Sequence, residues 1–89
     1  MKCIVTVIGK DAVGIIAGVC SLLADHGVNV LDISQTVLQD YFTMIMIVDT
    51  AAATVDFATL AEILRREGEA RSLVIRIQRE DIFEAMHRI

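Results

Sequence analysis

The spacing of apolar residues changes from every second to about every third or fourth position within the first part of the chain. Residues 2–9 (KCIVTVIG) are rich in β-branched residues and apolar on both alternating faces, which predicts a central strand covered on both sides. A glycine at each end of residues 9–14 interrupts this pattern. We then predict a helix, ended by Gly27 as its C′ residue, from apolar residues at helical spacing: Ile15, Ile16, Val19, Leu22 and Leu23.

The middle of the chain predicts a hairpin followed by a second helix. Residues 28–38 have extended character, Gln39 and Asp40 indicate a turn, and residues 41–49 alternate as the hairpin partner. Thr54 or Asp56 is expected to cap the second helix. Its apolar face consists of Phe57, Leu60, Ala61 and Leu64, with Gly68 near its end.

The last part of the chain predicts an edge strand and a short helix. Residues 73–78 alternate between an apolar face and a mixed face that carries Arg76 and Gln78, which is typical of a half-buried edge strand. Glu80 and Asp81 favour a helix N-terminus. We therefore predict a C-terminal helix at about residues 80–89, with an apolar stripe formed by Ile82, Phe83, Met86 and Ile89.

The predicted order, β-α-β-β-α-β plus a C-terminal helix, is that of a ferredoxin-like α+β fold. We expect one domain, residues 1–89, because no linker or low-complexity segment divides the chain. Right-handed crossovers would put both long helices on one face of a four-stranded antiparallel sheet. The other face would be apolar, so a second subunit, the tail helix, or both must cover it.

The composition strengthens the expectation of a partner subunit. The 89 residues are 55% hydrophobic and include no proline or tryptophan, and the mean hydropathy is +0.61. In a chain this short, burial and ordering come close to balance, so we expect a homodimer or a higher homo-oligomer. No apolar run reaches the roughly 20 residues that span a bilayer. We expect neither a signal peptide nor a membrane partner.

Charge and cysteine usage narrow the function classes further. A net charge of −4 argues against nucleic acid as a partner, and only Tyr41 and Phe42 could act as the stacking aromatics of an RNA-recognition module. Cys3 and Cys20 form no Cys-x-x-Cys pair. We expect them to be inert thiols in a reducing cytoplasm.

The sequence contains few residues that are candidates for catalysis or metal binding. Residues 9–14 contain no cysteine or histidine, which argues against metal transfer, and no arginine precedes Arg65 to hold a phosphate. His26 and His87 lack ligand spacing and are expected to cap a helix or lie on the surface. The late arginines alternate with acids, as on a screened surface. We therefore expect no enzyme, no metal and no cofactor.

The segment 9–14 (GKDAVG), which runs into the first helix, is the candidate for ligand binding. Its glycines permit unusual backbone angles, and N–H groups at the helix start can receive a carboxylate, with Lys10 adding positive charge. Asp11 could pair with a ligand ammonium group, so the segment suits a small zwitterion. A purely structural turn, with Asp11 as a capping acid, is the alternative.

At these residues the chain resembles the ACT domain, a small regulatory fold that typically binds amino acids. Residues 5–37 are similar to the family's loop G-x-D-x-x-G-I, apolar helix and strand N-V/I-x-D-I-x-Q. Residues 32–37 (DISQTV) and 76–89 (RIQREDIFEAMHRI) resemble a family of standalone single ACT-domain proteins. The chain is also similar to the ACT halves of the glycine cleavage system transcriptional repressor.

The resemblance implies a site between two copies of the chain. In ACT domains two copies pair side by side, and effectors bind between the first loop of one copy and the second strand of its neighbour. Carried over to this chain, the family's site would include Lys10, Asp11, Ala12, Val13, Gly14, Asn29, Val30 and Leu31. For Asn29 there is an alternative, since it could serve only to start its strand.

We therefore expect a non-enzymatic, cytoplasmic regulatory domain that binds a small amino-acid-like effector at a homodimer interface. The resemblance supplies no catalytic residue. The alternative is a ligand-free protein–protein interaction module, whose edge strands or apolar sheet face dock on another protein.

Overall fold

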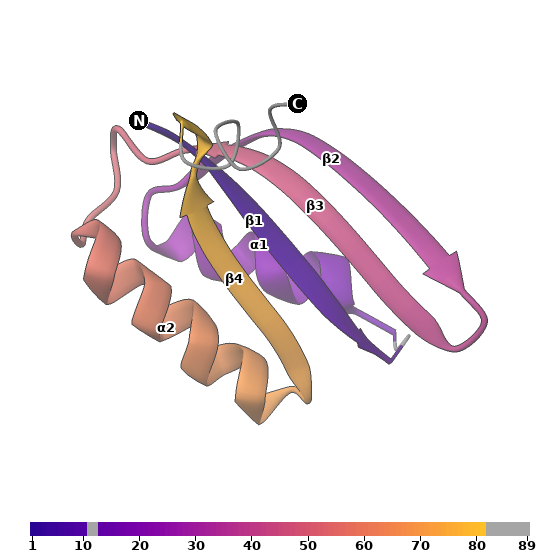
Figure 1. Ribbon diagram of the computed structural model, residues 1–89. Coiled ribbons are helices and arrows are strands. Elements are labelled where there is room, and N and C mark those ends of the chain that lie inside the picture. Colours follow the sequence, from indigo (N-terminus) through magenta and orange to yellow (C-terminus); the bar gives the residue numbers. More distant parts are fainter. Residues whose placement is uncertain (11–12, 82–89) are drawn as a thin grey trace.

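The computed structural model describes residues 1–10 and 13–81 of the chain (Figure 1). Within this part, the elements follow the predicted order β-α-β-β-α-β, which confirms the ferredoxin-like fold. The predicted C-terminal helix falls largely on residues 82–89, outside the described residues. The bounds of the elements are β1 Lys2–Lys10, α1 Ile15–Asp25, β2 Asn29–Leu38, β3 Tyr41–Asp49, α2 Phe57–Ala70 and β4 Leu73–Arg79.

The four strands form one antiparallel sheet in the order β2-β3-β1-β4. β1 lies in the interior of the sheet, where Cys3 has Val48 of β3 on one side and Arg79 of β4 on the other. Both helices lie against the same face of the sheet (Figure 1). β2 and β4 are therefore its two edges, which confirms the edge position predicted for the last strand.

The core lies between the sheet and the two helices. Alternate residues of β1 and β3 point into it, as do residues four apart on each helix. Gly68 lets α2 approach β4 closely, since a Cβ atom at this position would lie 2.9 Å from the carbonyl oxygen of Leu73. The largest fully buried side chains are Leu23, Met44, Met46, Leu60, Leu64, Val5, Val7, Val19, Val48 and Cys3.

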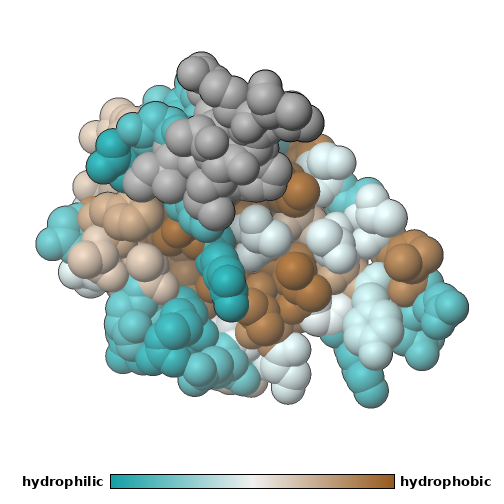
Figure 2. Space-filling model, in the orientation of Figure 1, coloured by the Kyte–Doolittle hydropathy of each residue, from teal (hydrophilic) through white to brown (hydrophobic). Residues whose placement is uncertain are grey.

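The face of the sheet turned away from the helices, here called the open face, is only partly covered. On β1 the side chain of Ile4 is 6% exposed, whereas that of Ile8 is 45% exposed. The two-sided burial predicted for the first strand therefore holds at Ile4 and is wrong at Ile8. Ile8 lies beside Val74 of β4, and Figure 2 shows apolar side chains gathered on this face. Neither α1 nor α2 covers these side chains, because both helices pack on the opposite face.

Short-range chemistry fixes the ends of the helices. Gly27 follows α1 with a φ of 74°, a conformation that favours glycine, so its predicted role as the C′ residue is confirmed. Of the two predicted caps of α2, Asp56 is the one used: its carboxylate accepts a hydrogen bond from the Thr59 N–H at 2.8 Å. Hydrogen bonds from Thr59 hold the pKa of Asp56 below its ordinary value. Neither helix of the described ranges is long and apolar enough to cross a membrane.

Candidate functional site

Helix α1 begins at a residue that has no side chain. Gly14 is its N-cap, in the left-handed region with a φ of 87°, and its carbonyl oxygen accepts the N–H of Gly18 at 2.9 Å. The first turn of α1 contains no acidic residue. Because the first N–H groups of a helix carry partial positive charge and need acceptors from outside the helix, this helix start is suited to an anionic group.

A hollow lies between the start of α1 and the second half of β2. It encloses about 500 Å³, within the range of roughly 300–1,000 Å³ found for small-molecule sites. Its lining side chains are apolar except for the amide of Gln35. We call it the α1–β2 hollow; its lining residues are Gly14, Ile15, Ile16, Ala17, Gln35, Val37 and Phe42.

The loop residues predicted to bind a ligand lie at this end of the molecule. Lys10 is the last residue of β1, opposite Tyr41 of β3, and its side chain is exposed. Val13 and Gly14 lead into α1 and are also exposed. Asp11 and Ala12 lie outside the described residues. Among the predicted loop residues, Gly14 is the one that lines the α1–β2 hollow.

The predicted residues of the second strand lie at the other end of α1. Asn29, Val30 and Leu31 begin β2 shortly after α1 ends at Asp25, and the 11 residues of this helix span about 16 Å. One copy of the chain therefore does not bring the two predicted groups together. The residues of β2 that approach the helix start are Gln35 and Val37, which the sequence reasoning missed.

The position of the hairpin turn could have predicted that Gln35 and Val37 lie on the helix side of β2. A turn at Gln39 and Asp40 pairs Leu38 with Tyr41, and therefore Val37 with Phe42. Gln35 and Val37 then share one side of β2, the side of the buried residues of β3. That register follows from the turn and the alternation of side chains.

A bulge at Leu31 alters the start of β2. Val30 pairs with Val48 and Asp32 with Ile47, so Leu31 has no partner in β3. Since Val30 and Ile33 both pair with residues on the buried side of β3, the bulge brings them onto one face, although they are three positions apart. Such bulges redirect side chains at sheet edges and beside binding sites. The side chain of Leu31 is 47% exposed.

Arg71 brings a second positive charge close to the start of α1. Its guanidinium packs against Gly18, where a Cβ atom would collide with it, and it also pairs with Glu67 at 3.8 Å. Gly9, near the end of β1, is also in a close contact: a Cβ atom there would collide with the side chain of Leu73 and lie 3.2 Å from the carbonyl oxygen of Ser72. The turn between α2 and β4 thus lies beside the first loop. No local pattern in the sequence predicts this contact, because it joins distant parts of the chain.

The remaining reactive side chains have structural surroundings. Cys3 is fully buried, and burial raises the pKa of its thiol, while Cys20 is half-buried; both are free. The Nδ1 atom of His26 lies 2.9 Å from the Leu22 carbonyl oxygen, which can only accept, so this nitrogen donates. The described residues contain no cluster of three or more histidine, cysteine or acidic side chains that could hold a metal ion.

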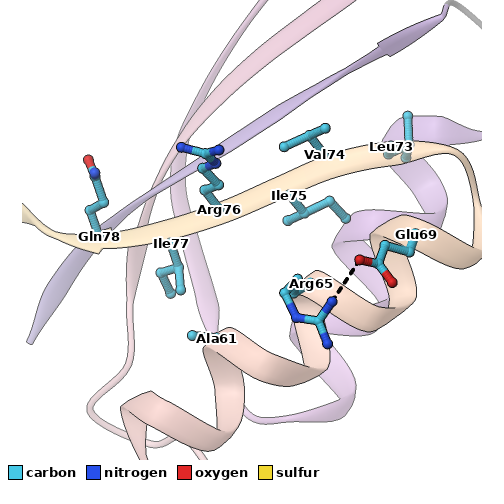
Figure 3. A pocket seen from close by; sticks show the side chains of 9 residues that line it. All are labelled: Ala61, Arg65, Glu69, Leu73, Val74, Ile75, Arg76, Ile77 and Gln78. Carbon is cyan, nitrogen blue, oxygen red and sulfur yellow. Dashed lines mark hydrogen bonds and ion pairs between the residues drawn. The ribbon is translucent and has the colours of Figure 1, made fainter.

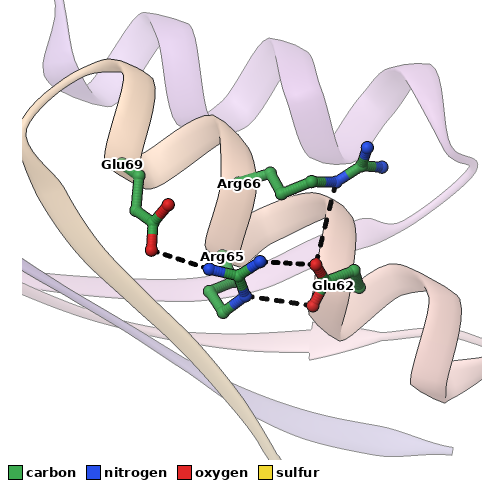
Figure 4. A network of polar contacts seen from close by, with 4 residues as sticks. All are labelled: Glu62, Arg65, Arg66 and Glu69. Atoms are coloured by element: carbon green, nitrogen blue, oxygen red, sulfur yellow. Dashed lines mark hydrogen bonds and ion pairs between the residues drawn. The ribbon is translucent and has the colours of Figure 1, made fainter.

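The arginines of α2 are paired with acids, as predicted for a screened surface. Arg65 donates to both carboxylate oxygens of Glu62 and, at 2.7 Å, to Glu69 (Figure 4). Hydrogen bonds from Arg65 lower the pKa of Glu62 and the same contacts raise that of Arg65. Arg66 also approaches Glu62, at 4.0 Å. Arg76 on β4 differs from these residues, since it has no ion pair with any described residue.

The comparison with known families agrees with this geometry. The family model described as "ACT domain" matches residues 2–78. The chain belongs to the ACT domain family. ACT domains are typically regulatory domains that bind ligands.

Relatives of similar length accompany this ACT domain. A UPF0237 protein of Clostridium acetobutylicum is 52% identical over 89 residues, which is 100% of both chains. A UPF0237 protein of Methanocaldococcus jannaschii is 49% identical over 88 residues, covering 99% of this chain and 98% of the relative. The solved structure of an ACT domain protein from Streptococcus pneumoniae has a TM-score of 0.84 at 46% identity, with 98% of each chain covered.

More distant structures share the fold of this ACT domain. One is the crystal structure of a putative glycine cleavage system transcriptional repressor, with a TM-score of 0.73 at 23% identity. The match covers 86% of this chain and 44% of that one. In these longer proteins the ACT fold is therefore one part of the chain.

Proposed function

We propose that this ACT domain is a non-enzymatic sensor that binds a small amino-acid-like effector at the interface of a homodimer. The observation that carries the proposal is the α1–β2 hollow. It opens beside the start of α1, where the N-cap Gly14 has no side chain, and next to the edge strand β2, which has no other described strand on its outer side. The family membership supports the ligand class, because ACT domains typically bind small effectors.

The edge strand β2 supports pairing with a second copy. β2 is 10 residues long and mostly exposed, and it has no partner on its outer side in the described chain. Four large apolar side chains along it are exposed: Leu31, Ile33, Val37 and Leu38. A long apolar edge of this kind is a template for another strand. Antiparallel pairing of β2 with β2 of a second copy would cover it with a two-fold symmetric contact.

This pairing would also complete the predicted site. When two copies of β2 overlap along their full length in antiparallel fashion, residues 29–31 of one copy lie opposite residues 36–38 of the other. Val37 lines the α1–β2 hollow. Asn29, Val30 and Leu31 of the second copy would therefore approach the hollow beside Gly14, which explains why one copy separates the two groups.

The effector's charged groups have matching groups in this arrangement. The carboxylate would lie at the N–H groups of residues 12–14 and the first turn of α1, with Lys10 adding positive charge. Asp11 would pair with the ammonium group. Asn29 of the second copy would offer its amide to either group, while Val30 and Leu31 would contact the effector's side chain.

Regulation would follow from linkage between binding and assembly. A ligand that contacts two chains stabilises the dimer that binds it, by about 2.7 kcal/mol at a concentration of 100 times Kd. The subunit interface, rather than bond making, would therefore carry the signal. We also propose a cytoplasmic location, which the free thiols of Cys3 and Cys20 support.

A thermal-shift screen of the full chain with each of the twenty amino acids tests the proposal. We expect at least one of them to raise Tm in a concentration-dependent manner. Lys10→Ala should weaken this response, whereas Lys2→Ala, which removes an exposed lysine at the opposite end of β1, is the matched control and should leave the response unchanged.

The contrary result is equally distinct. If none of the amino acids raises the Tm of the chain, and none changes the Tm of Asp11→Ala, effector binding is contradicted. The ligand-free interaction module would then be favoured, and the exposed apolar edge of β2 is the observation that supports it. Sedimentation equilibrium of the unliganded chain separates the two parts of the proposal, because it reports dimer formation without any ligand.

A further inference from the structure

The second edge of the sheet, β4, is also unpaired on its outer side. β4 consists of Leu73–Arg79 and pairs only with β1 in the described chain. An edge strand presents a row of unpaired N–H and C=O groups along its outer side. These groups can pair with an added strand, which is how several peptide-binding domains hold extended ligands.

Helix α2 runs beside this edge and forms a groove with it. The helix contributes Ala61, Arg65 and Glu69, which are four residues apart and therefore form one stripe. The strand contributes residues 73–78. Figure 3 shows Ile75 and Ile77 directed toward α2, with Val74, Arg76 and Gln78 on the opposite side of the strand. We call this feature the β4 groove; it encloses about 380 Å³.

The two arginines of the β4 groove differ in their partners. Arg65 is held between Glu62 and Glu69 (Figure 4), so its charge is balanced within the chain. Arg76 has no ion pair with a described residue, and the neighbouring side chains on its face of β4, Val74 and Gln78, are uncharged. An acidic residue of a partner could therefore pair with Arg76 without displacing an acid of the described residues.

A second copy of the chain is a poor partner for this edge. In an antiparallel pair of two β4 strands that overlap along their full length, Arg76 of one copy lies opposite Arg76 of the other. Directly opposed like charges destabilise a strand pair. β2 lacks this conflict, since the same operation brings Ile33 opposite Ser34 and Asp32 opposite Gln35.

We propose that the β4 groove takes up an extended, acidic segment of a partner protein, which adds to the sheet as a strand beside β4. Alternate side chains of this segment would face α2, where apolar residues fit against Ala61 and the aliphatic stem of Arg65. The other side chains would lie on the open face, with an acidic residue next to Arg76. This interaction is independent of the effector site, which lies beside α1 and β2.

A pair of short peptides tests the proposal on the full chain. The probes are VTVEVTV and VTVKVTV, blocked at both ends and fluorescently labelled, with valines on one side of the extended peptide and the charge on the other. We expect the acidic peptide to bind more tightly, as measured by anisotropy, and to slow amide exchange in residues 73–79. Arg76→Glu should weaken binding of the acidic peptide by about fivefold to tenfold and strengthen binding of the lysine peptide.

Two controls keep the result specific. Arg66→Glu makes the same charge change on α2 outside the β4 groove, and we expect it to leave the preference for the acidic peptide unchanged. The second control uses two acidic peptides, each N-methylated on one of the two sets of alternate residues. We expect N-methylation of one set to abolish binding, because an added strand pairs with β4 through the N–H groups of one set only.

Several results would overturn the proposal. These are an unchanged peptide preference in Arg76→Glu, an equal effect of Arg66→Glu, or full binding of both N-methylated peptides. Amide protection of β4 that rises with protein concentration in the absence of peptide would also overturn it, because a second copy would then occupy this edge.

Discussion

The two edges of the sheet, β2 and β4, offer different surfaces to a partner strand. β2 has 10 residues, and Asp32 is the charged residue among them. β4 has 7 residues, two of which are arginines. β2 is followed through the hairpin by β3, whereas β4 lies beside β1 and along α2 (Figure 1). The longer edge therefore offers apolar side chains, and the shorter edge offers a groove with a positive charge, Arg76, that has no ion pair among the described residues.

This difference teaches how a small sheet can direct its two edges to different partners. A strand pairs well with its own copy when the two-fold operation brings unlike or neutral residues together, as it does for β2. An arginine at the centre of β4 makes the same operation unfavourable. A single central residue can thus restrict self-association to one edge.

Charging the β2 edge should produce the largest effect. In Leu31→Lys, each of two symmetric contacts would lose roughly 1.5 kcal/mol of apolar burial, so we expect the dimer Kd to rise about a hundredfold or more. Val74→Lys is the matched control, since Val74 is 53% exposed on β4 and the substitution adds the same charge. Sedimentation equilibrium measures both. Equal effects of the two substitutions would break the distinction between the edges.

A change under β4 should have an intermediate effect. In Gly68→Ala the new Cβ atom would lie 2.9 Å from the Leu73 carbonyl oxygen and 3.0 Å from Cγ1 of Ile75. We expect a loss of about 1–2 kcal/mol in the free energy of unfolding, because overpacking outweighs the better helix propensity of alanine. Denaturant unfolding at fixed protein concentration measures this loss.

The dimer Kd, which reports on the β2 edge, shows whether the effect of Gly68→Ala is confined to the β4 side. Gly68→Ala should leave the dimer Kd unchanged, because the contact it disturbs lies between α2 and β4. Glu69→Ala, at the neighbouring exposed position, should change the free energy of unfolding by no more than about 0.5 kcal/mol. A clear rise of the dimer Kd in Gly68→Ala would indicate that the two edges are coupled.

The sequence predicted the elements well because each is encoded locally. The alternation of residues 73–78 identifies β4 as an edge, and Gly27 and Asp56 mark helix ends through their own backbone and side-chain chemistry. The burial of β1 was predicted less well. Periodicity reports which face is apolar, but whether Ile8 is covered depends on what else packs there.

The candidate site was only partly predictable for a related reason. Lys10 and Gly14 follow from the loop, yet the bulge at Leu31 inserts a residue that leaves no mark in the alternation. The contact of Arg71 with Gly18 joins segments far apart in the chain. Contacts of this kind depend on how helices and strands pack together, which hydrophobic periodicity does not record.

The pH dependence of stability should show a smaller effect than Leu31→Lys and Gly68→Ala. The pKa of Asp56 is lower in the folded chain than its ordinary value of 3.8, through hydrogen bonds from Thr59, so the unfolded state binds the proton more readily. The stabilisation is therefore fully present above that value and is lost as the pH falls through the folded pKa. Asp56→Asn should retain the cap at neutral pH but show a shallower fall of Tm in acid.

The same titration distinguishes the two edges. Asp56 caps α2, which forms one wall of the β4 groove, so its protonation should loosen the β4 side without changing the dimer Kd. Asp49, whose pKa is lowered by the N–H of Ala51, and Glu62, whose pKa is lowered by Arg65, are unaltered in the variant and contribute to the acid dependence that remains. An unchanged acid slope in Asp56→Asn would contradict this assignment.

The central claim, that β2 is the edge for self-association and β4 is not, is tested most directly by amide hydrogen exchange of the unmodified chain at two protein concentrations. We expect the outward-facing amides of residues 29–38 to lose protection on dilution, while those of residues 73–79 exchange at the same rate at both concentrations. Protection of β2 that does not depend on concentration, or protection of β4 that does, would contradict the account.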